Sequence, residues 1–177
     1  MERFNAAVWL VDRHVAEGRG DQLAIRCQGR STSYAALQQE VWRAQHLLTG
    51  LGLRQGDRLA MVVQDDEAFP SVFLGALRSG IVAVPLTTML KGPALGAMIA
   101  DSGATAVVVS DTFAGTVADI VTTSPDVRHV VVCGDASGIE PSRPGVQLHA
   151  WAHHTDHDVA PVADTSDSSW SVWCAHA

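Results

Sequence analysis

The apolar positions near the start of the chain follow helical spacing first and strand spacing next. Residues 5–16 carry apolar side chains at helical steps and are followed by Gly18 and Gly20, which predicts a helix that ends there. Two short runs, Leu23–Cys27 and 31–34, flank a glycine-containing turn. This arrangement predicts a β-hairpin.

The clearest helical stripe follows this hairpin. Its apolar members recur at steps of three and four residues: Tyr34, Leu37, Val41, Ala44, Leu48 and Leu51. This spacing puts them on one face of a helix. Ser33 is the expected N-cap of that helix, and Gly50 or Gly52 is its expected C-terminal stop.

A strand–helix–strand unit comes next. Residues 58–63 form an almost continuous apolar run, which is typical of a strand covered on both faces. The acidic run Asp65-Asp66-Glu67 lies where the following helix is expected to begin, because carboxylates there complement the helix dipole. Residues 81–85 are the next predicted strand, which completes a βαβ unit.

The alternation of helix and strand then repeats. We expect a helix at 93–101, a strand at 105–109, a helix at 112–123 capped by Asp111, and a strand at His129–Cys133. Such alternation predicts an α/β fold, with a mostly parallel sheet flanked by helices.

The character of the chain changes after Cys133. Gly, Pro, Ser, Asp and His dominate, which predicts a surface excursion with one short strand at 146–148. The final aromatic stretch is the expected start of a further strand. We therefore expect an α/β subdomain at 1–133 and a separate excursion at 134–177.

Composition and charge narrow the range of partners. Hydrophobic residues make up 47% and charged residues 18%, as in ordinary globular domains. The net charge is −7, and the basic residues are scattered, with Lys91 as the single lysine. These features argue against nucleic acid as the main partner, because its binders need clustered Lys and Arg. The sequence has no run of the roughly 18 apolar residues that a membrane span needs.

The cysteines and the N-terminal residues indicate a cytoplasmic protein. Cys27, Cys133 and Cys174 are far apart and form no CxxC pair, which argues against a disulfide framework or a structural zinc site. The apolar run 6–11 is shorter than the apolar region of about 7–15 residues in a signal peptide.

Three stretches contain residues that could bind a ligand or take part in catalysis, but each has a simpler structural explanation. His149 and the three histidines within 153–157 could bind a metal, but no helical pattern orders them, and a polar loop is favoured. Asp65-Asp66-Glu67 could do acid–base work, yet the start of a helix explains them. The glycines of 50–56 have the wrong spacing for a dinucleotide fingerprint and follow a helix, so we interpret them as a helix stop and turn.

Three other stretches, in this order and spacing, resemble the front part of adenylate-forming enzymes. These are Ser-Tyr-Ala-Ala-Leu at 33–37, Gly-Leu-Arg-Gln-Gly-Asp-Arg-Leu-Ala at 52–60, and Phe-Leu-Gly-Ala-Leu-Arg-Ser-Gly-Ile-Val-Ala-Val-Pro-Leu at 73–86. The superfamily includes acyl-CoA synthetases, peptide-synthetase adenylation domains and luciferases. Residues 4–7, 11–21 and 69–75 are similar to benzoate-CoA ligases and their hydroxybenzoate relatives. The resemblance implies that the chain forms the first subdomain of the ligase fold.

The resemblance also implies a two-step reaction for the parent enzyme. An aromatic carboxylate attacks ATP, with magnesium present, to give an acyl-adenylate, and the CoA thiolate then displaces AMP. The phosphate loop of that family is expected after 170–173, and residues 174–177 do not match it. We therefore expect a truncated N-terminal portion that is inactive alone, binds no cofactor itself, and carries no catalytic or metal-ligating residue.

Lys91 is the one candidate binding residue that the resemblance offers. It lies just past the strand that ends at Pro85, and the carboxyl ends of parallel strands are where ligands bind in open α/β sheets. In some relatives a basic residue in this region touches CoA phosphates. Lys91 is thus a candidate for binding a CoA phosphate, with an ordinary surface lysine as the alternative.

Other functions stay open at this point. The chain could be a non-catalytic α/β interaction module that binds a protein partner through an exposed sheet edge, or a degraded gene product. It could also be an unrelated flavodoxin- or receiver-like domain, although it has no acidic pair at the end of its first strand and no clear phosphate loop. Whether residues 1–177 alone are an enzyme is left undecided.

Overall fold

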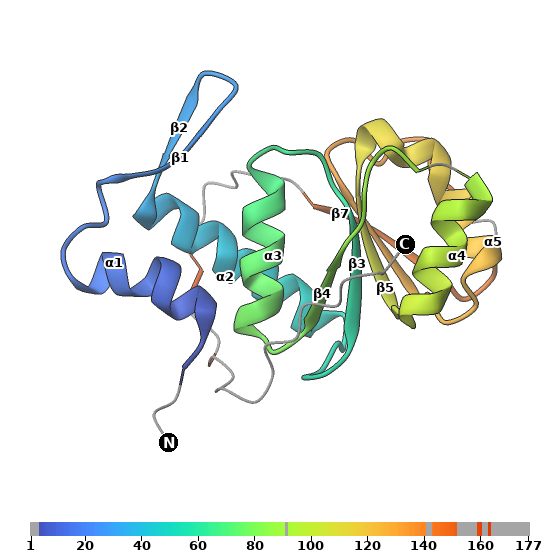
Figure 1. Cartoon of the computed structure of the whole chain (residues 1–177), viewed down its shortest axis with the longest axis horizontal. Coiled ribbons are helices and arrows are strands. Elements are labelled where there is room, and N and C mark those ends of the chain that lie inside the picture. Colours follow the sequence, from blue (N-terminus) through green and yellow to red (C-terminus); the bar gives the residue numbers. More distant parts are fainter. Residues whose placement is uncertain (1–3, 91, 141–142, 152–158, 161–162, 164–177) are drawn as a thin grey trace. The chain divides into compact units, whose positions relative to one another are not determined.

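The chain forms two compact units (Figure 1). The computed structural model describes residues 4–90, 92–140, 143–151, 159–160 and 163. Within that range, the first unit comprises 4–56, 65–82, 159–160 and 163, and the second comprises 57–64 and 83–151.

The first unit begins with a helix that contains one wide turn. Val8–Asp12 is a π-helical turn, labelled η1, and Arg13–Ala16 continues it as α1. The N–H of Arg13 reaches back five residues to the carbonyl of Val8. The helix predicted at 5–16 is confirmed, and the π turn is a feature that apolar spacing does not reveal.

The hairpin and the long helix follow as predicted. Leu23–Cys27 (β1) pairs antiparallel with Arg30–Ser33 (β2). Tyr34–Gly50 (α2) begins at Ser33, whose Oγ accepts a hydrogen bond of 3.3 Å from the N–H of Ala36. A side-chain oxygen in this position satisfies one of the free amides at the helix start.

Helix α3 (Ala68–Arg78) packs against α2 and completes the first unit's core. The buried members of this core come from η1, α2, α3 and the residues just before η1: Ala7, Val11, Leu37, Val41, Leu74 and Leu77. The two long helices approach closely at Gly75, where a Cβ would lie 2.6 Å from Ala44 Cβ and 3.0 Å from the Val41 carbonyl oxygen. The absence of a side chain at Gly75 therefore sets the separation of the helices.

The second unit is built on a five-stranded parallel sheet in the order β4-β3-β5-β6-β7 (Figure 1). The strands are Arg58–Val62 (β3), Val82–Pro85 (β4), Ala106–Ser110 (β5), His129–Cys133 (β6) and Gln147–Trp151 (β7). Strands β5 and β6 pair in register and are almost wholly buried, as expected for parallel strands covered on both faces. The predicted α/β fold, with a parallel sheet flanked by helices, is confirmed.

Helices α4 (Gly92–Ser102) and α5 (Val117–Thr123) lie side by side along one face of this sheet (Figure 1). The Ser124 hydroxyl ties them together by donating to the Gly96 carbonyl at 3.0 Å. The single helix predicted at 112–123 is partly wrong, because Asp111–Thr116 forms a 3₁₀ segment, η2. The expected cap, Asp111, instead accepts a hydrogen bond from the N–H of Asp135 at 3.2 Å.

The last described strand is longer than its prediction. A short strand was expected at 146–148, and β7 runs from Gln147 to Trp151 in register with β6. Trp151, the last residue of β7, is buried. The further strand expected in the final aromatic stretch lies outside the described residues.

Substitution of Gly75 by alanine should destabilise the protein. The added methyl group must displace Ala44 or the backbone at Val41, and overpacking of this kind costs about 1–3 kcal/mol. Gly50→Ala is the matched control, because a Cβ there meets nothing within 4 Å at the end of the same α2 helix. Urea unfolding should show a lower midpoint for Gly75→Ala and none of that loss for Gly50→Ala. Equal midpoints for the two variants would contradict the close approach.

Candidate functional site

The carboxyl edge of the sheet is where the topology places a ligand site. Strand β4 follows β3 on one side, and the chain then crosses to β5 on the other side of β3. Ligands of open α/β sheets bind where the strand order reverses in this way. Between the two strands, the buried Ser110 hydroxyl accepts a hydrogen bond of 3.0 Å from the N–H of Gln64. Its oxygen holds the two strand ends together.

A tight polar corner lies at the ends of β5 and β6. Gly134 has φ of +109°, and a Cβ there would lie 2.2 Å from Asp111 Oδ2, so a side chain is excluded. Hydrogen bonds from the Ser137 side chain and then from its N–H lower the pKa of the Asp135 carboxyl. Both carboxylates at this corner are engaged by backbone N–H groups of the loop after β6. They organise the loop, and acid–base chemistry is not indicated.

Beside this corner is an open hollow of about 350 Å³. Gly115, Val117 and Ala118 line one side, and loop residues 137–140 line the other. Glu140 is the one charged side chain among these lining residues. A carboxylate repels phosphate, so the hollow does not have the character of a nucleotide phosphate site.

The predicted site residue Lys91 lies outside the described residues. Its neighbour Thr87 is described, and the Thr87 hydroxyl accepts a hydrogen bond of 3.3 Å from the N–H of Met89. This contact forms a local turn after β4 at the carboxyl edge of the sheet. The proposed CoA contact of Lys91 is not tested here and stays a prediction.

The acidic run and the glycine stretch have the structural roles favoured by the sequence. Asp66 Oδ1 accepts a hydrogen bond of 2.8 Å from the N–H of Ala68 at the start of α3. Glu67 is buried and forms an ion pair with Arg30 at 3.4 Å. Gly52 and Gly56 have positive φ in the turn after α2, which confirms the helix stop.

Two of the eight histidines meet within the sheet. The rings of His129 on β6 and His149 on β7 are 5.6 Å apart between centroids. His129 Nδ1 and His149 Nε2 are buried and have no hydrogen-bond partner. Burial, then the His149 imidazole and the Arg128 guanidinium, lower the pKa of His129. The described residues contain no group of three or more potential metal ligands, and the histidines at 153–157 lie outside them.

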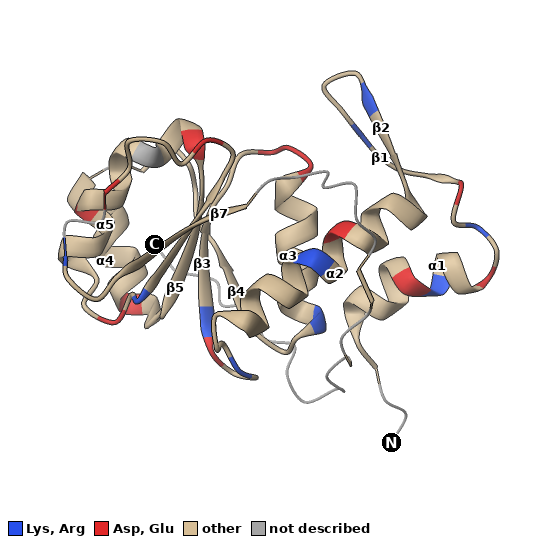
Figure 2. Ribbon diagram, turned by 180° about the vertical axis from the view of Figure 1, so that it is seen from behind, with Lys and Arg blue, Asp and Glu red and all other residues tan. Residues whose placement is uncertain are grey.

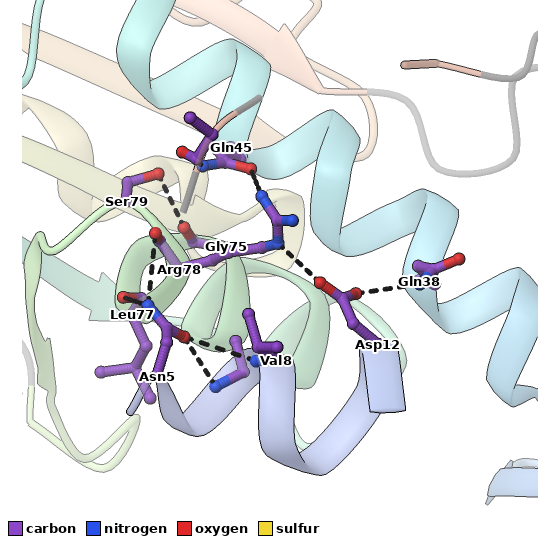
Figure 3. A network of polar contacts seen from close by, with 11 residues as sticks. Asn5, Val8, Asp12, Gln38, Gln45, Gly75, Leu77, Arg78 and Ser79 are labelled. Atoms are coloured by element: carbon purple, nitrogen blue, oxygen red, sulfur yellow. Dashed lines mark hydrogen bonds and ion pairs between the residues drawn. The ribbon is translucent and has the colours of Figure 1, made fainter. Parts of the chain in front are cut away.

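A polar network among the described residues lies in the first unit (Figure 3). Arg78, 6% exposed as a residue, donates through its guanidinium to Asp12 Oδ2 at 3.0 Å and to Gln45 Oε1 at 2.6 Å. Asp12 Oδ1 accepts from Gln38 at 3.0 Å, and Asn5 Nδ2 donates to the Leu77 carbonyl at 3.2 Å. The network ties the first helix to α2 and α3.

Sequence reasoning gave this network no role. The apolar spacing assigns no role to Asp12, and Arg78 belongs to the stretch 73–86 that resembles adenylate-forming enzymes. One signal was available: Arg78 falls on the buried side of α3, one residue after Leu77, where an arginine needs acceptors. The partners could not be found, because Asp12 is 66 residues away in sequence.

Comparison with known proteins decides the family. The chain matches the AMP-binding enzyme family over residues 12–169. It belongs to that family. It is 36% identical over 164 residues to a 4-hydroxybenzoate–CoA/benzoate–CoA ligase of Rhodopseudomonas palustris, and 35% identical over 136 residues to a benzoate–CoA ligase of Thauera aromatica.

These AMP-binding relatives are much longer than the present chain. The alignments cover 93% and 76% of this chain but only 30% and 26% of the two relatives. Among solved structures, a benzoate CoA ligase from Burkholderia xenovorans matches with a TM-score of 0.66 and 32% identity, over 73% of this chain and 26% of that one. An anthranilate CoA ligase in complex with anthranoyl-AMP shares the fold with a TM-score of 0.70, 24% identity, and coverage of 82% and 27%.

The distribution of charge in this family member is mixed. Figure 2 shows basic and acidic positions interspersed along the ribbon of each unit, without a basic stripe on any described helix. Within the described part of the chain, no helix is both long and apolar enough to cross a bilayer.

His129 should make the protein less stable as the pH falls. The pKa of folded His129 lies below the unfolded value of about 6.5. As pH falls below that value, the unfolded chain takes up a proton that the folded protein resists, and the free energy of unfolding decreases. Chemical unfolding between about pH 7.5 and 5 should show this slope.

Replacement of the imidazole should flatten that slope. His129→Gln removes the titrating group, and Arg128→Gln weakens the effect by removing a neighbouring positive charge. Part of the slope should persist in both variants, because burial and two arginines also lower the pKa of His14. An unchanged slope in His129→Gln would contradict the assignment.

Proposed function

We propose that residues 1–177 form the front part of an ATP-dependent carboxylate–CoA ligase for benzoate or a hydroxybenzoate. The observation that supports this most strongly is the 36% identity over 93% of the chain to a 4-hydroxybenzoate–CoA/benzoate–CoA ligase. In the complete enzyme the acid would form an acyl-adenylate with ATP and magnesium, and CoA would then displace AMP.

In this proposal residues 1–177 are inactive by themselves. The chain aligns with about a third or less of the matched CoA ligases, so most of each relative has no counterpart in it. The hollow at the carboxyl edge of the sheet carries a carboxylate and no cation among its lining residues. The part contributed here would be a scaffold, and ATP, magnesium and CoA would bind mainly to the remainder.

The same proposal covers the cellular setting and the partners. We place the protein in the cytoplasm, in agreement with the reduced cysteines Cys27 and Cys133. Its ligands would be an aromatic carboxylate, ATP and CoA, without nucleic acid. A protein partner would bind at β4 or β7, the two edge strands of the described sheet. Membership of the AMP-binding family removes the reason for an unrelated flavodoxin-like assignment.

A chimeric enzyme tests the ligase assignment. Residues 1–177 would replace the aligned segment of the Rhodopseudomonas palustris ligase. The chimera should form benzoyl-CoA from benzoate, ATP and CoA, because the grafted scaffold supports the same site. Residues 1–177 alone should show no benzoate-dependent ATP–pyrophosphate exchange. A folded chimera without activity would refute the assignment, and exchange by the isolated chain would refute its inactivity.

Lys91 can be tested in the same chimera. If its ammonium group binds a CoA phosphate, Lys91→Ala should raise the Michaelis constant for CoA about tenfold, as loss of a charge-assisted hydrogen bond would. The Michaelis constant for ATP should stay unchanged. Arg26→Ala is the control, since Arg26 is an exposed basic residue of β1. An unchanged constant for CoA would leave Lys91 as an ordinary surface lysine.

A further inference from the structure

Three side chains of α2 contact the main chain of a distant segment. The carboxamide oxygen of Gln39 accepts a hydrogen bond of 2.9 Å from the N–H of Val159. His46 Nε2 lies 2.7 Å from the Ala160 carbonyl oxygen, and Gln45 Nε2 donates to the Ala163 carbonyl oxygen at 3.1 Å. The segment belongs to the first unit, although more than 110 residues separate the two members of each contact.

Every one of these contacts goes to a backbone atom. The segment offers one donor, at Val159, and two acceptors, at Ala160 and Ala163. Because a carbonyl oxygen can only accept, the His46 nitrogen in this contact carries the proton. Pro161 follows Ala160 in sequence, and a residue before proline is disfavoured in the helical conformation. Because all three contacts go to main-chain atoms, this face of α2 binds a backbone whatever its side chains.

Arg78 determines whether the Gln45 side chain offers a hydrogen-bond donor or an acceptor to the segment. Gln45 is fully buried, and its two amide atoms have different partners. A guanidinium has donors only, so the Gln45 oxygen must face Arg78 and its NH₂ group must face the segment. Asp12 holds Arg78 from the other side through the 3.0 Å ion pair (Figure 3).

We propose that α2 carries a docking surface for a polypeptide backbone, formed by Gln39, Gln45 and His46, whose occupants are the main-chain groups of Val159, Ala160 and Ala163. The surface binds one backbone donor and two backbone acceptors. Arg78 fixes the orientation of the Gln45 amide, so that its NH₂ group faces the segment. Docking of the segment is thereby coupled to the helix that contains Asp12. This role is separate from the ligase assignment, because it needs neither ATP nor CoA.

Replacement of glutamine by glutamate should have opposite effects on docking at two positions of α2. Gln39→Glu keeps an oxygen that accepts the Val159 N–H, so the segment should stay docked. Gln45→Glu keeps the acceptor for Arg78 but presents an oxygen to the Ala163 carbonyl, so the segment should be released. Gln39→Met removes the acceptor and should also release it. Gln22→Glu is a control that introduces the same charge at an exposed residue of the same unit, before β1.

The readout is amide hydrogen exchange at Val159, measured by NMR on the complete chain near pH 7. Exchange should quicken at least tenfold in Gln39→Met and Gln45→Glu, and stay within about twofold in Gln39→Glu and Gln22→Glu, with α2 amides protected in all four. If the α2 amides lose protection in Gln45→Glu, that variant reports on the helix and not on docking. The comparison of Gln39→Glu with Gln39→Met then tests the proposal. Equal exchange in Gln39→Glu and Gln39→Met, or an unprotected Val159 amide in the unsubstituted chain, would overturn the proposal.

Discussion

The first unit depends on a buried guanidinium that must have acceptors. Arg78 is almost fully removed from water, and removal of one partner of such a buried charge typically costs about 3–5 kcal/mol. Its acceptors come from two different elements, Asp12 at the end of the π turn and Gln45 on α2. An arrangement of the three helical segments that separated Arg78 from these acceptors would leave its charge unsatisfied.

Close helix packing and this polar network support each other. Gly75 lets α3 approach α2, and Arg78 is on the same helix three residues later. The hydroxyl of Ser79, also buried, returns to the Gly75 carbonyl at 2.9 Å and satisfies that group near the helix end. Apolar burial brings the elements together, and the polar contacts select the register in which they meet.

The elements of the fold were largely predictable because their causes are local. The stripe from Leu37 to Leu48, the Ser33 cap and the apolar strands each depend on residues close in sequence. The 3₁₀ segment at Asp111–Thr116 was missed because Asp111 is engaged by Asp135, a tertiary contact. For the same reason the partners of Arg78 and the docking face of α2 could not be found from the sequence, whereas the family could be identified from short contiguous stretches.

The sheet register has a consequence for the order in which the chain can fold during synthesis. Leu59 on β3 pairs with Ala106 on β5, a separation of 106 − 59 = 47 residues. The hairpin and α2 need only neighbouring residues, so they can form as the chain leaves the ribosome. Strand β3 must wait until β5 has emerged, with an apolar run unpaired on that side meanwhile, and such non-local pairing is slow. Nascent chains in which β3 has emerged but β5 has not would therefore expose the apolar strand to chaperones.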